Sequence, residues 1–184
     1  MEGVWLLRKI GVTPEERRAR MVERDIRGRG IDDPLVLAAV AQVPRERFVP
    51  EKLQQHAYDD IPLPIPGGQT ISQPYIVCAM IASLGLRGGE CALDVGTGSG
   101  YAAAVISRIA GQVYTVECVP RLARDASDVF REIGYDNILV IEAFGLSLEN
   151  LVAATKIWRL MYENEKQLAT DGLAFMKAEV AKRW

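Results

Sequence analysis

Residues 91–100 read CALDVGTGSG, a short apolar run that ends in three glycines spaced two residues apart. The apolar run predicts a buried strand over Cys91–Val95, and the segment Ala102–Ala110 after the glycines predicts a helix. Glycine lets the backbone turn sharply and approach a ligand without a Cβ in the way. The helix that follows supplies free backbone N–H groups and the positive end of its dipole. The stretch therefore predicts a strand, a ligand-binding loop and a helix in succession.

The segments after this stretch repeat the alternation of strand and helix. Val113–Val116 and Ile138–Ile141 predict two further strands, and Pro120–Ile133 predicts the helix between them. Strands that alternate with helices imply right-handed crossovers and a parallel sheet. The predicted fold class is therefore α/β, with a Rossmann-like sheet.

Three interpretations of the glycine loop stand side by side. It could be a structural turn, or a dinucleotide site, although its G-x-G-x-G spacing is one residue shorter than the usual dinucleotide motif. It could instead bind S-adenosylmethionine. Glu117 lies 19 residues after Gly98, where an α/β nucleotide fold presents a carboxylate to ribose hydroxyls. Asp94 suits a cationic ligand better than a pyrophosphate, and residues 94–100 resemble the first motif of the class I methyltransferases.

The chain before the sheet predicts short helices over residues 1–61. A hydroxyl cap at Thr13 opens a helix that should end near Gly28 or Gly30, and Asp33 precedes a second helix. The chain is long enough for one domain with a substantial core and hardly for two, so these helices are assigned to the same domain as the α/β part.

A stretch rich in proline and glycine separates these helices from the sheet. Residues 60–75 read DIPLPIPGGQTISQPY, which predicts a loop over Pro62–Thr70 and then a buried helix over Pro74–Leu84. Ser72 or Gln73 is expected near the cap of that helix. Capping alone does not require so long a combination of prolines, glycines and hydroxyls.

The same stretch closely resembles the signature of the protein-L-isoaspartate O-methyltransferases, and shorter motifs agree in unbroken order over residues 20–145. The resemblance implies transfer of a methyl group from S-adenosylmethionine to the α-carboxylate of L-isoaspartyl residues in damaged proteins, leaving S-adenosylhomocysteine. The ester then closes to a succinimide, which can hydrolyse to normal aspartate. Because the carboxylate is already ionised near pH 7, no strong general base is required.

The resemblance also implies roles for individual residues. Ser72 is the implied active-site residue, and Gln69, Thr70 and Ile71 are implied to shape the isoaspartyl pocket with it. The implied cofactor site comprises Asp94, Gly96, Thr97, Gly98, Ser99, Gly100 and Glu117. His56, the only histidine, is expected at the surface rather than in catalysis.

The resemblance stops after the third predicted strand of the sheet. Where the family has Gly-Asp-Gly, with an acidic residue for the adenine amino group, residues 143–145 read AFG. Residues 146–184 predict helices with apolar stripes in place of the family's remaining strands. We therefore divide the single domain into an N-terminal helical segment, 1–61, a partial S-adenosylmethionine-binding α/β core, 62–145, and a helical C-terminal tail, 146–184.

Because the family pattern is lost after the third predicted strand, other functions have to be considered in addition to methyl transfer. Without the family's next strand, the strand that carries Asp94 becomes a sheet edge that the helical tail, a second subunit or an irregular strand must cover. Otherwise we expect a truncated or frame-shifted product. Our first hypothesis remains methyl transfer, by an enzyme with a rearranged C-terminal part of its sheet. The alternative is a catalytically weakened or inactive methyltransferase-like module that self-associates or binds partners through its tail. An NAD-dependent oxidoreductase would explain the glycine loop but not residues 60–75.

Composition and charge bear on other classes of protein. The 184 residues are 49% hydrophobic and 25% charged, which argues against a disordered chain. The net charge is -2, and residues 1–60 hold 11 basic and 11 acidic side chains, so we expect no nucleic-acid partner. Three cysteines are too few for a disulfide framework or a zinc site and are expected to be small core residues, with no metal bound. The longest apolar stretch, Ile76–Leu86, is too short to cross a membrane, so we expect a cytoplasmic protein.

Overall fold

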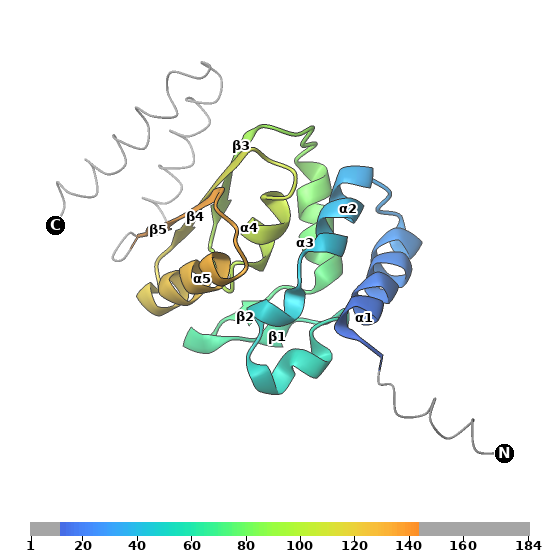
Figure 1. The fold of residues 1–184 in the computed structure, drawn as a ribbon, viewed down its shortest axis with the longest axis horizontal. Helices are drawn as coiled ribbons and strands as arrows, with labels where there is room; N and C mark the ends of the chain where they lie inside the picture. The colour runs from blue at the N-terminus through green and yellow to red at the C-terminus, as the bar shows by residue number, and fades with distance from the viewer. Residues whose placement is uncertain (1–11, 144–184) are drawn as a thin grey trace.

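The computed structural model describes residues 12–143, in which helices pack against a parallel sheet (Figure 1). The helices and strands are, in chain order, α1 Pro14–Met21, α2 Pro34–Gln42, β1 Leu63–Pro64, β2 Thr70–Ile71, α3 Pro74–Ser83, β3 Cys91–Val95, α4 Tyr101–Ile106, β4 Gln112–Glu117, α5 Pro120–Glu132 and β5 Ile138–Glu142. Short 3-10 helices cover Arg45–Phe48 and Glu51–His56. The predicted helical tail, 146–184, lies outside the described residues.

The N-terminal helices begin at the caps that the sequence indicates. Thr13 Oγ1 accepts a hydrogen bond from the N–H of Glu16 at 3.2 Å, and the Thr13 N–H donates to Glu16 Oε2 at 3.0 Å, which completes a capping box. After α1 the chain continues through a π-helical and a 3-10 turn to Gly30, whose φ of 93° ends the helical run. Asp33 caps α2 by accepting two backbone N–H bonds. The predicted starts and stops of this segment are confirmed.

The predicted loop over Pro62–Thr70 contains a small antiparallel hairpin, which corrects that expectation. Strands β1 and β2 pair with Leu63 opposite Ile71, and both of these side chains are buried. The turn between them has Gly67 at φ 73° and Gly68 at φ 68°, a left-handed conformation that favours glycine. The sequence concealed the hairpin because its strands are two residues long and rich in proline, which weakens any strand signal.

Helix α3 is capped by a residue distant in the sequence. Gln73 occupies the cap position, as expected, but neither its side chain nor that of Ser72 makes a capping hydrogen bond. Asp60 Oδ1 accepts a hydrogen bond from the N–H of Tyr75 at 2.9 Å, and Asp60 Oδ2 accepts one from Gln73 Nε2 at 2.9 Å. Arg29 forms an ion pair with the same carboxylate at 2.6 Å, so Asp60 joins the N-terminal helices to the start of α3.

The predicted parallel sheet is confirmed, with strand order β3-β4-β5. Its register pairs Asp94 with Thr115 and Glu117 with Glu142. Both crossovers progress in the same direction along the sheet, so right-handed connections place α4 and α5 on one face (Figure 1). The α/β prediction is therefore correct for this part of the chain.

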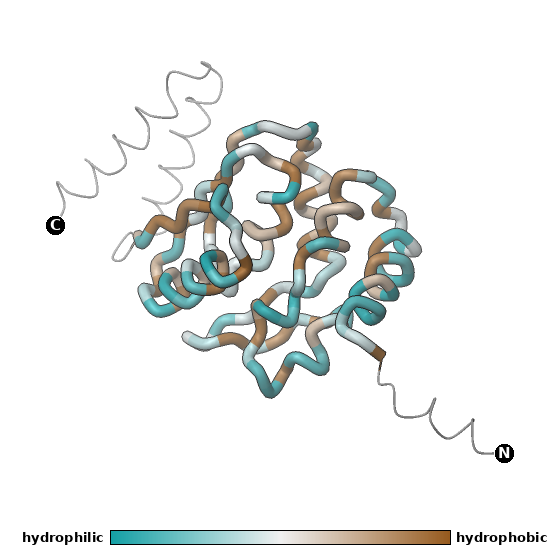
Figure 2. The backbone as a smooth tube through the Cα atoms, viewed as in Figure 1, coloured by the Kyte–Doolittle hydropathy of each residue, from teal (hydrophilic) through white to brown (hydrophobic). Residues whose placement is uncertain are grey.

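The hydrophobic core lies between this face of the sheet and the helices. Hydrophilic residues dominate α1 and α5 in Figure 2, whereas the strands and the buried helix α4 are mainly hydrophobic. Of the three cysteines, Cys78 is buried and Cys91 is partly buried, but Cys118 is exposed just after β4. The expectation of three core cysteines is therefore wrong for Cys118, which stands beyond the end of its strand.

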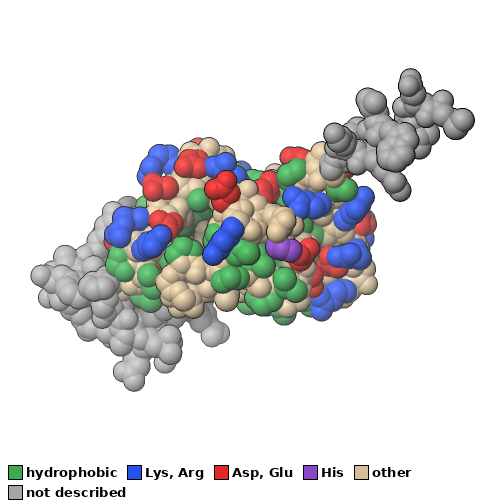
Figure 3. Space-filling model, turned by 90° about the horizontal axis from the view of Figure 1, so that it is seen from below, with side chains coloured by type: hydrophobic (Ala, Val, Ile, Leu, Met, Phe, Trp, Pro, Cys, Tyr) green, Lys and Arg blue, Asp and Glu red, His purple; other side chains and the backbone are tan. Residues whose placement is uncertain are grey.

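The charged surface of the described residues mixes both signs. Basic and acidic side chains are interspersed on the face shown in Figure 3, and surface ion pairs such as Arg47 with Glu132 join them. His56 is an exposed residue bonded to Asp59, as expected for a surface histidine. Among residues 12–143, no helix could cross a membrane, and no cluster of three or more His, Cys, Asp or Glu side chains could hold a metal ion.

Candidate active site

The glycine loop, residues 96–100, is bonded to the neighbouring strand. The N–H groups of Gly96 and Thr97 both donate to the carbonyl oxygen of Val116 in β4, at 2.8 and 3.1 Å. The N–H of Gly100 donates to the carbonyl oxygen of Thr97 at 2.7 Å, which closes the turn into α4. These bonds fix the loop at the carboxyl end of the sheet, where parallel α/β folds bind ligands.

Two of the loop glycines are required for different reasons. Gly100 has φ 89°, and a Cβ there would lie 2.6 Å from Cζ of Phe130 in α5, closer than packed atoms approach. Phe130 is itself held against Phe48, with ring centroids 6.3 Å apart. Gly96 has φ 92°, but nothing lies within 4 Å of the corresponding Cβ position. Gly100 therefore permits helix packing, whereas Gly96 keeps one side of the loop open to a ligand.

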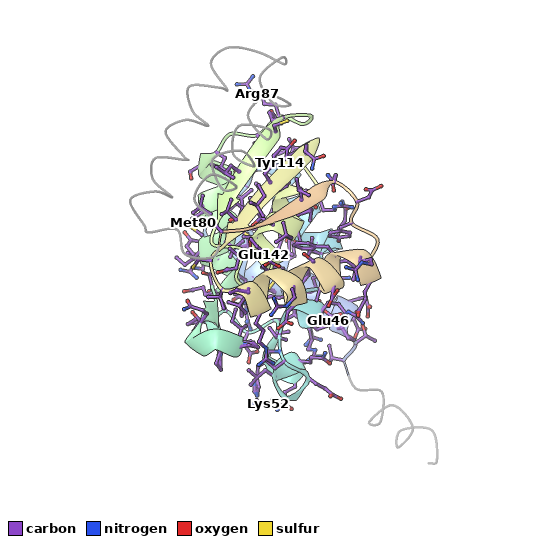
Figure 4. The ribbon with its side chains drawn as sticks, turned by 90° about the vertical axis from the view of Figure 1, so that its left-hand side faces the viewer. Glu46, Lys52, Met80, Arg87, Tyr114 and Glu142 are labelled. Carbon is purple, nitrogen blue, oxygen red and sulfur yellow. The ribbon has the colours of Figure 1, made fainter. Side chains whose placement is uncertain are left out.

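Glu117, at the end of β4, turns its carboxylate back onto the loop. Glu117 Oε2 accepts a hydrogen bond from the N–H of Gly98 at 2.8 Å, and Oε1 accepts one from the N–H of Val119 at 2.9 Å. The residue is only 6% exposed. A carboxylate oxygen can accept two hydrogen bonds, so each keeps capacity for a hydroxyl donor. Glu142 pairs with Glu117 in the parallel register between β4 and β5, and it is the last residue of β5 (Figure 4).

Asp94 belongs to a chain of hydrogen bonds under the loop. Thr115 Oγ1 donates to Asp94 Oδ2 at 2.8 Å, and the hydroxyls of Thr97 and Thr115 lie 2.7 Å apart. Loss of water around the carboxylate raises the pKa of Asp94 to about 6, and the negative charge of Glu117 acts in the same direction. The bond from Thr115 opposes the rise in pKa, because it favours the ionised carboxylate.

The hairpin that leads to Ser72 packs beside the glycine loop. A Cβ at Gly98 would lie 3.8 Å from Cδ1 of Ile65, in the hairpin. A Cβ at Gly67 would lie 3.6 Å from Cγ1 of Val119 and 3.7 Å from Cδ1 of Leu122. The structure therefore brings the two loops together, although they are about 30 residues apart in the sequence.

A buried arginine fixes the backbone at Ser72. Arg45 is fully buried, and its Nη2 donates to the Ser72 carbonyl oxygen at 2.8 Å while its Nε donates to the Ala57 carbonyl oxygen at 2.8 Å. The guanidinium carbon lies 4.6 Å from the ring centroid of Tyr101, the first residue of α4. Burial lowers the pKa of the Arg45 guanidinium. Arg45 thus contacts both the segment at Ser72 and the helix that follows the glycine loop.

The predicted pocket residues separate into exposed and buried positions. The side chains of Gln69, Thr70 and Ser72 are exposed and can reach a ligand from solvent. Ile71 is buried in the hydrophobic core, so its side chain holds the hairpin in place.

Comparison with known proteins identifies relatives that share most of the described part of this chain. Residues 16–147 match the model of the family described as Protein-L-isoaspartate(D-aspartate) O-methyltransferase. A Protein-L-isoaspartate O-methyltransferase 1 of Rhodopseudomonas palustris (strain HaA2) is 55% identical over 129 residues, which cover 70% of this chain and 53% of the relative. A Protein-L-isoaspartate O-methyltransferase 2 of Pelobacter propionicus is 53% identical over 131 residues, 71% of this chain and 58% of the relative.

The chain belongs to the protein-L-isoaspartate O-methyltransferase family.

Solved structures of this family agree with the fold. The crystal structure of a protein-L-isoaspartate O-methyltransferase from Plasmodium falciparum, in complex with S-adenosyl-L-homocysteine, matches with TM-score 0.60 and 25% identity. The match covers 74% of this chain and 68% of that one. The chain spans about half the length of the curated relatives named above. The family and the Rossmann-like fold predicted from residues 60–75 and 91–100 are therefore confirmed.

Three residues in and around this candidate site were not anticipated from the sequence. Thr115 lies in a predicted strand, and its contact with Asp94 depends on the register between two strands. Arg45 lies in a segment whose family resemblance was noted, but nothing in the sequence indicated that its side chain is buried. Asp60 bonds to side chains and backbone 13 and 15 residues away. Of these three contacts, only that of Thr115 had a signal in the sequence, because both Thr115 and Asp94 lie in predicted strands that were expected to pair.

Proposed function

We propose that this protein transfers the methyl group of S-adenosylmethionine to the α-carboxylate of L-isoaspartyl residues in damaged proteins. The observation that carries the proposal is the contact between the hairpin before Ser72 and the glycine loop, with Ile65 Cδ1 3.8 Å from the Cβ position of Gly98. A methyl donor on the glycine loop and a carboxylate beside Ser72 would then lie in neighbouring sites. The names of the relatives support the same reaction.

The residues around the glycine loop fit S-adenosylmethionine better than a dinucleotide. Two acidic side chains, Asp94 and Glu117, flank the loop and act on each other electrostatically. A pyrophosphate beside them would meet like charge, whereas an ammonium or sulfonium group would be attracted. We assign Asp94, the loop residues 96–100 and Glu117 to this site, with Glu117 accepting the ribose hydroxyls. When bound, S-adenosylmethionine supplies an electrophilic methyl group.

The Ser72 segment fits the recognition of a carboxylate. An ionised carboxylate needs hydrogen-bond donors and no general base. Ser72 provides an exposed hydroxyl on backbone that Arg45 holds through the Ser72 carbonyl oxygen. Gln69 and Thr70 add an exposed amide and hydroxyl on the same hairpin. We propose that Ser72 binds and orients the isoaspartyl carboxylate, that Gln69 and Thr70 line the rest of the pocket, and that Ile71 shapes it by anchoring the hairpin in the core, so that catalysis rests on alignment.

Transfer of tritiated methyl to a synthetic peptide tests this function. We expect base-labile label on a peptide with L-isoaspartate, none on the same peptide with normal aspartate, and a loss of at least about 100-fold for Ser72→Ala. Equal labelling of both peptides would contradict the proposed substrate. Binding of S-adenosylhomocysteine by a folded protein without any transfer would instead favour the catalytically inactive binding module.

A further inference from the structure

We propose that Thr115 is a positioning residue of the cofactor site, whose hydroxyl fixes the Asp94 carboxylate in one orientation and keeps it negatively charged for a cationic ligand group. The inference rests on the proposed S-adenosylmethionine site and adds to it a residue outside the glycine loop. Thr115 itself would not contact the ligand, because it is 0% exposed. It would act through Asp94.

The pairing of the strands sets up this contact. Asp94 in β3 and Thr115 in β4 are direct partners in the parallel register. Their side chains leave the same face of the sheet, because neighbouring residues in register share a side of the pleat. The resulting bond from Thr115 Oγ1 to Asp94 Oδ2 is 2.8 Å long. This bond holds one carboxylate oxygen, and Asp94 Oδ1 stays available to a ligand.

The direction of the hydrogen-bond chain follows from its proton count. A threonine hydroxyl has one proton to donate. Because Thr115 donates its proton to Asp94, the hydroxyl of Thr97, 2.7 Å away, must donate to Thr115. Thr97 is also buried, at 4% exposed, and belongs to the glycine loop. The chain therefore links the loop conformation to an ionised Asp94.

The surroundings of Asp94 show why such support is needed. The pKa of Asp94 is raised to about 6, mainly by burial and in part by the negative charge of the Glu117 carboxylate from β4. Helix α4, which packs on this part of the sheet, carries only one titratable side chain, Tyr101, and that ring lies beside Arg45. The hydroxyl of Thr115 is the contact that lowers the pKa of Asp94. Without it, the carboxylate would take up a proton at higher pH.

Substitutions at Thr115 separate this role from simple packing. Thr115→Val keeps the shape of the side chain and its preference for strands but removes the hydroxyl, whereas Thr115→Ser keeps the hydroxyl. The full chain would be labelled with ¹³C at its aspartate carboxyls, and Asp94 would be titrated by NMR, with Asp94→Asn identifying the signal. In parallel, calorimetry would measure S-adenosylhomocysteine binding from pH 5.5 to 8.5, with circular dichroism confirming the fold at each pH.

We expect Thr115→Val to raise the pKa of Asp94 by about one unit and Thr115→Ser to restore the wild-type value. Affinity for S-adenosylhomocysteine should be within about twofold of wild type at pH 8.5 and about five- to tenfold weaker at pH 5.5. An unchanged titration of Asp94, or a loss of affinity that is equal at every pH, would overturn the inference. If wild-type protein binds no S-adenosylhomocysteine, the proposed cofactor fails while the NMR titration still decides the role of Thr115. Should Thr115→Val not fold, Thr115→Cys, with a weak S–H donor, carries the same test.

Discussion

The carboxylate of Glu117 accepts a hydrogen bond from the backbone N–H of Gly98 at 2.8 Å, across 19 residues of sequence. This bond ties the end of β4 to the loop after β3, at the edge of the sheet where the two strands finish. The bond from Thr115 to Asp94 lies two residues earlier along β4. The two bonds together place two acidic side chains, Asp94 and Glu117, next to the same loop. The glycine loop is therefore held by side chains as well as by its backbone bonds to Val116.

Replacing Glu117 by glutamine should weaken cofactor binding. The amide group of glutamine cannot accept from both the Gly98 and Val119 N–H groups, because its nitrogen is a donor. We expect affinity for S-adenosylhomocysteine to fall by about tenfold or more, since a charged hydrogen bond contributes about 1.5 to 3 kcal/mol. Calorimetry at pH 7.5 measures this loss, and Glu142→Gln in the neighbouring strand is the matched control. Equal effects of the two substitutions would argue against a specific role for Glu117.

Gly100→Ala should destabilise the protein through a clash with α5. The new Cβ would lie 2.6 Å from Phe130 Cζ, at a φ of 89° that side chains rarely adopt. We expect a loss of about 2 to 4 kcal/mol in the free energy of unfolding, from strain and overpacking together. Gly30→Ala is the control, because its φ of 93° is similar but nothing lies within 4 Å. A urea titration showing equal losses for both variants would refute the packing role.

Arg45→Met should disturb both stability and the Ser72 segment. The methionine side chain fills much of the same space but leaves the carbonyl oxygens of Ala57 and Ser72 without their donors. We expect a loss of about 2 to 5 kcal/mol in the free energy of unfolding. Arg47→Met is the matched control, because Arg47 forms only an exposed ion pair with Glu132 and should lose less than about 1 kcal/mol. Thermal unfolding that ranks the two variants the other way would contradict this account.

Asp94→Asn should stabilise the folded protein at neutral pH. The pKa of Asp94 is raised from 3.8 to about 6, so the folded state binds more protons than the unfolded state between these values. Stability contributed by this group is therefore present at low pH and is lost as the pH rises through about 6. We expect the variant to exceed wild type by on the order of 2 kcal/mol at pH 8 and to match it near pH 4. Urea titrations of both proteins across this pH range measure the difference in the free energy of unfolding. No gain in stability for the variant at pH 8 would show that burial does not destabilise the ionised Asp94.

Local patterns predicted the parallel sheet because each strand is a short apolar run between glycines or prolines. Cys91–Val95 was predicted with the bounds that the structure shows, and Pro120–Glu132 within one residue. The predicted helix over Ala102–Ala110 is shorter in the structure, Tyr101–Ile106, because its last turn loosens before β4. Helix α4 is buried on nearly all sides, so an apolar run rather than an alternation of faces was the signal for it.

Contacts between distant segments could not be predicted in the same way. Arg45 is fully buried, although arginine is rarely so, because two backbone carbonyls and the Tyr101 ring surround it. Asp60 reaches the start of α3 only because the chain folds back at this point. The family resemblance identified which loops matter, and the structure added Arg45, Asp60 and Thr115, the side chains that hold them.

Calorimetric titration of the full chain with S-adenosylhomocysteine tests the central claim most directly, since the proposed methyl transfer depends on the glycine loop binding this ligand. We predict one binding site per chain, weaker binding in Glu117→Gln, and no measurable binding of NAD⁺ at the same concentration. Folded protein that binds no S-adenosylhomocysteine, or that prefers NAD⁺, would contradict the claim.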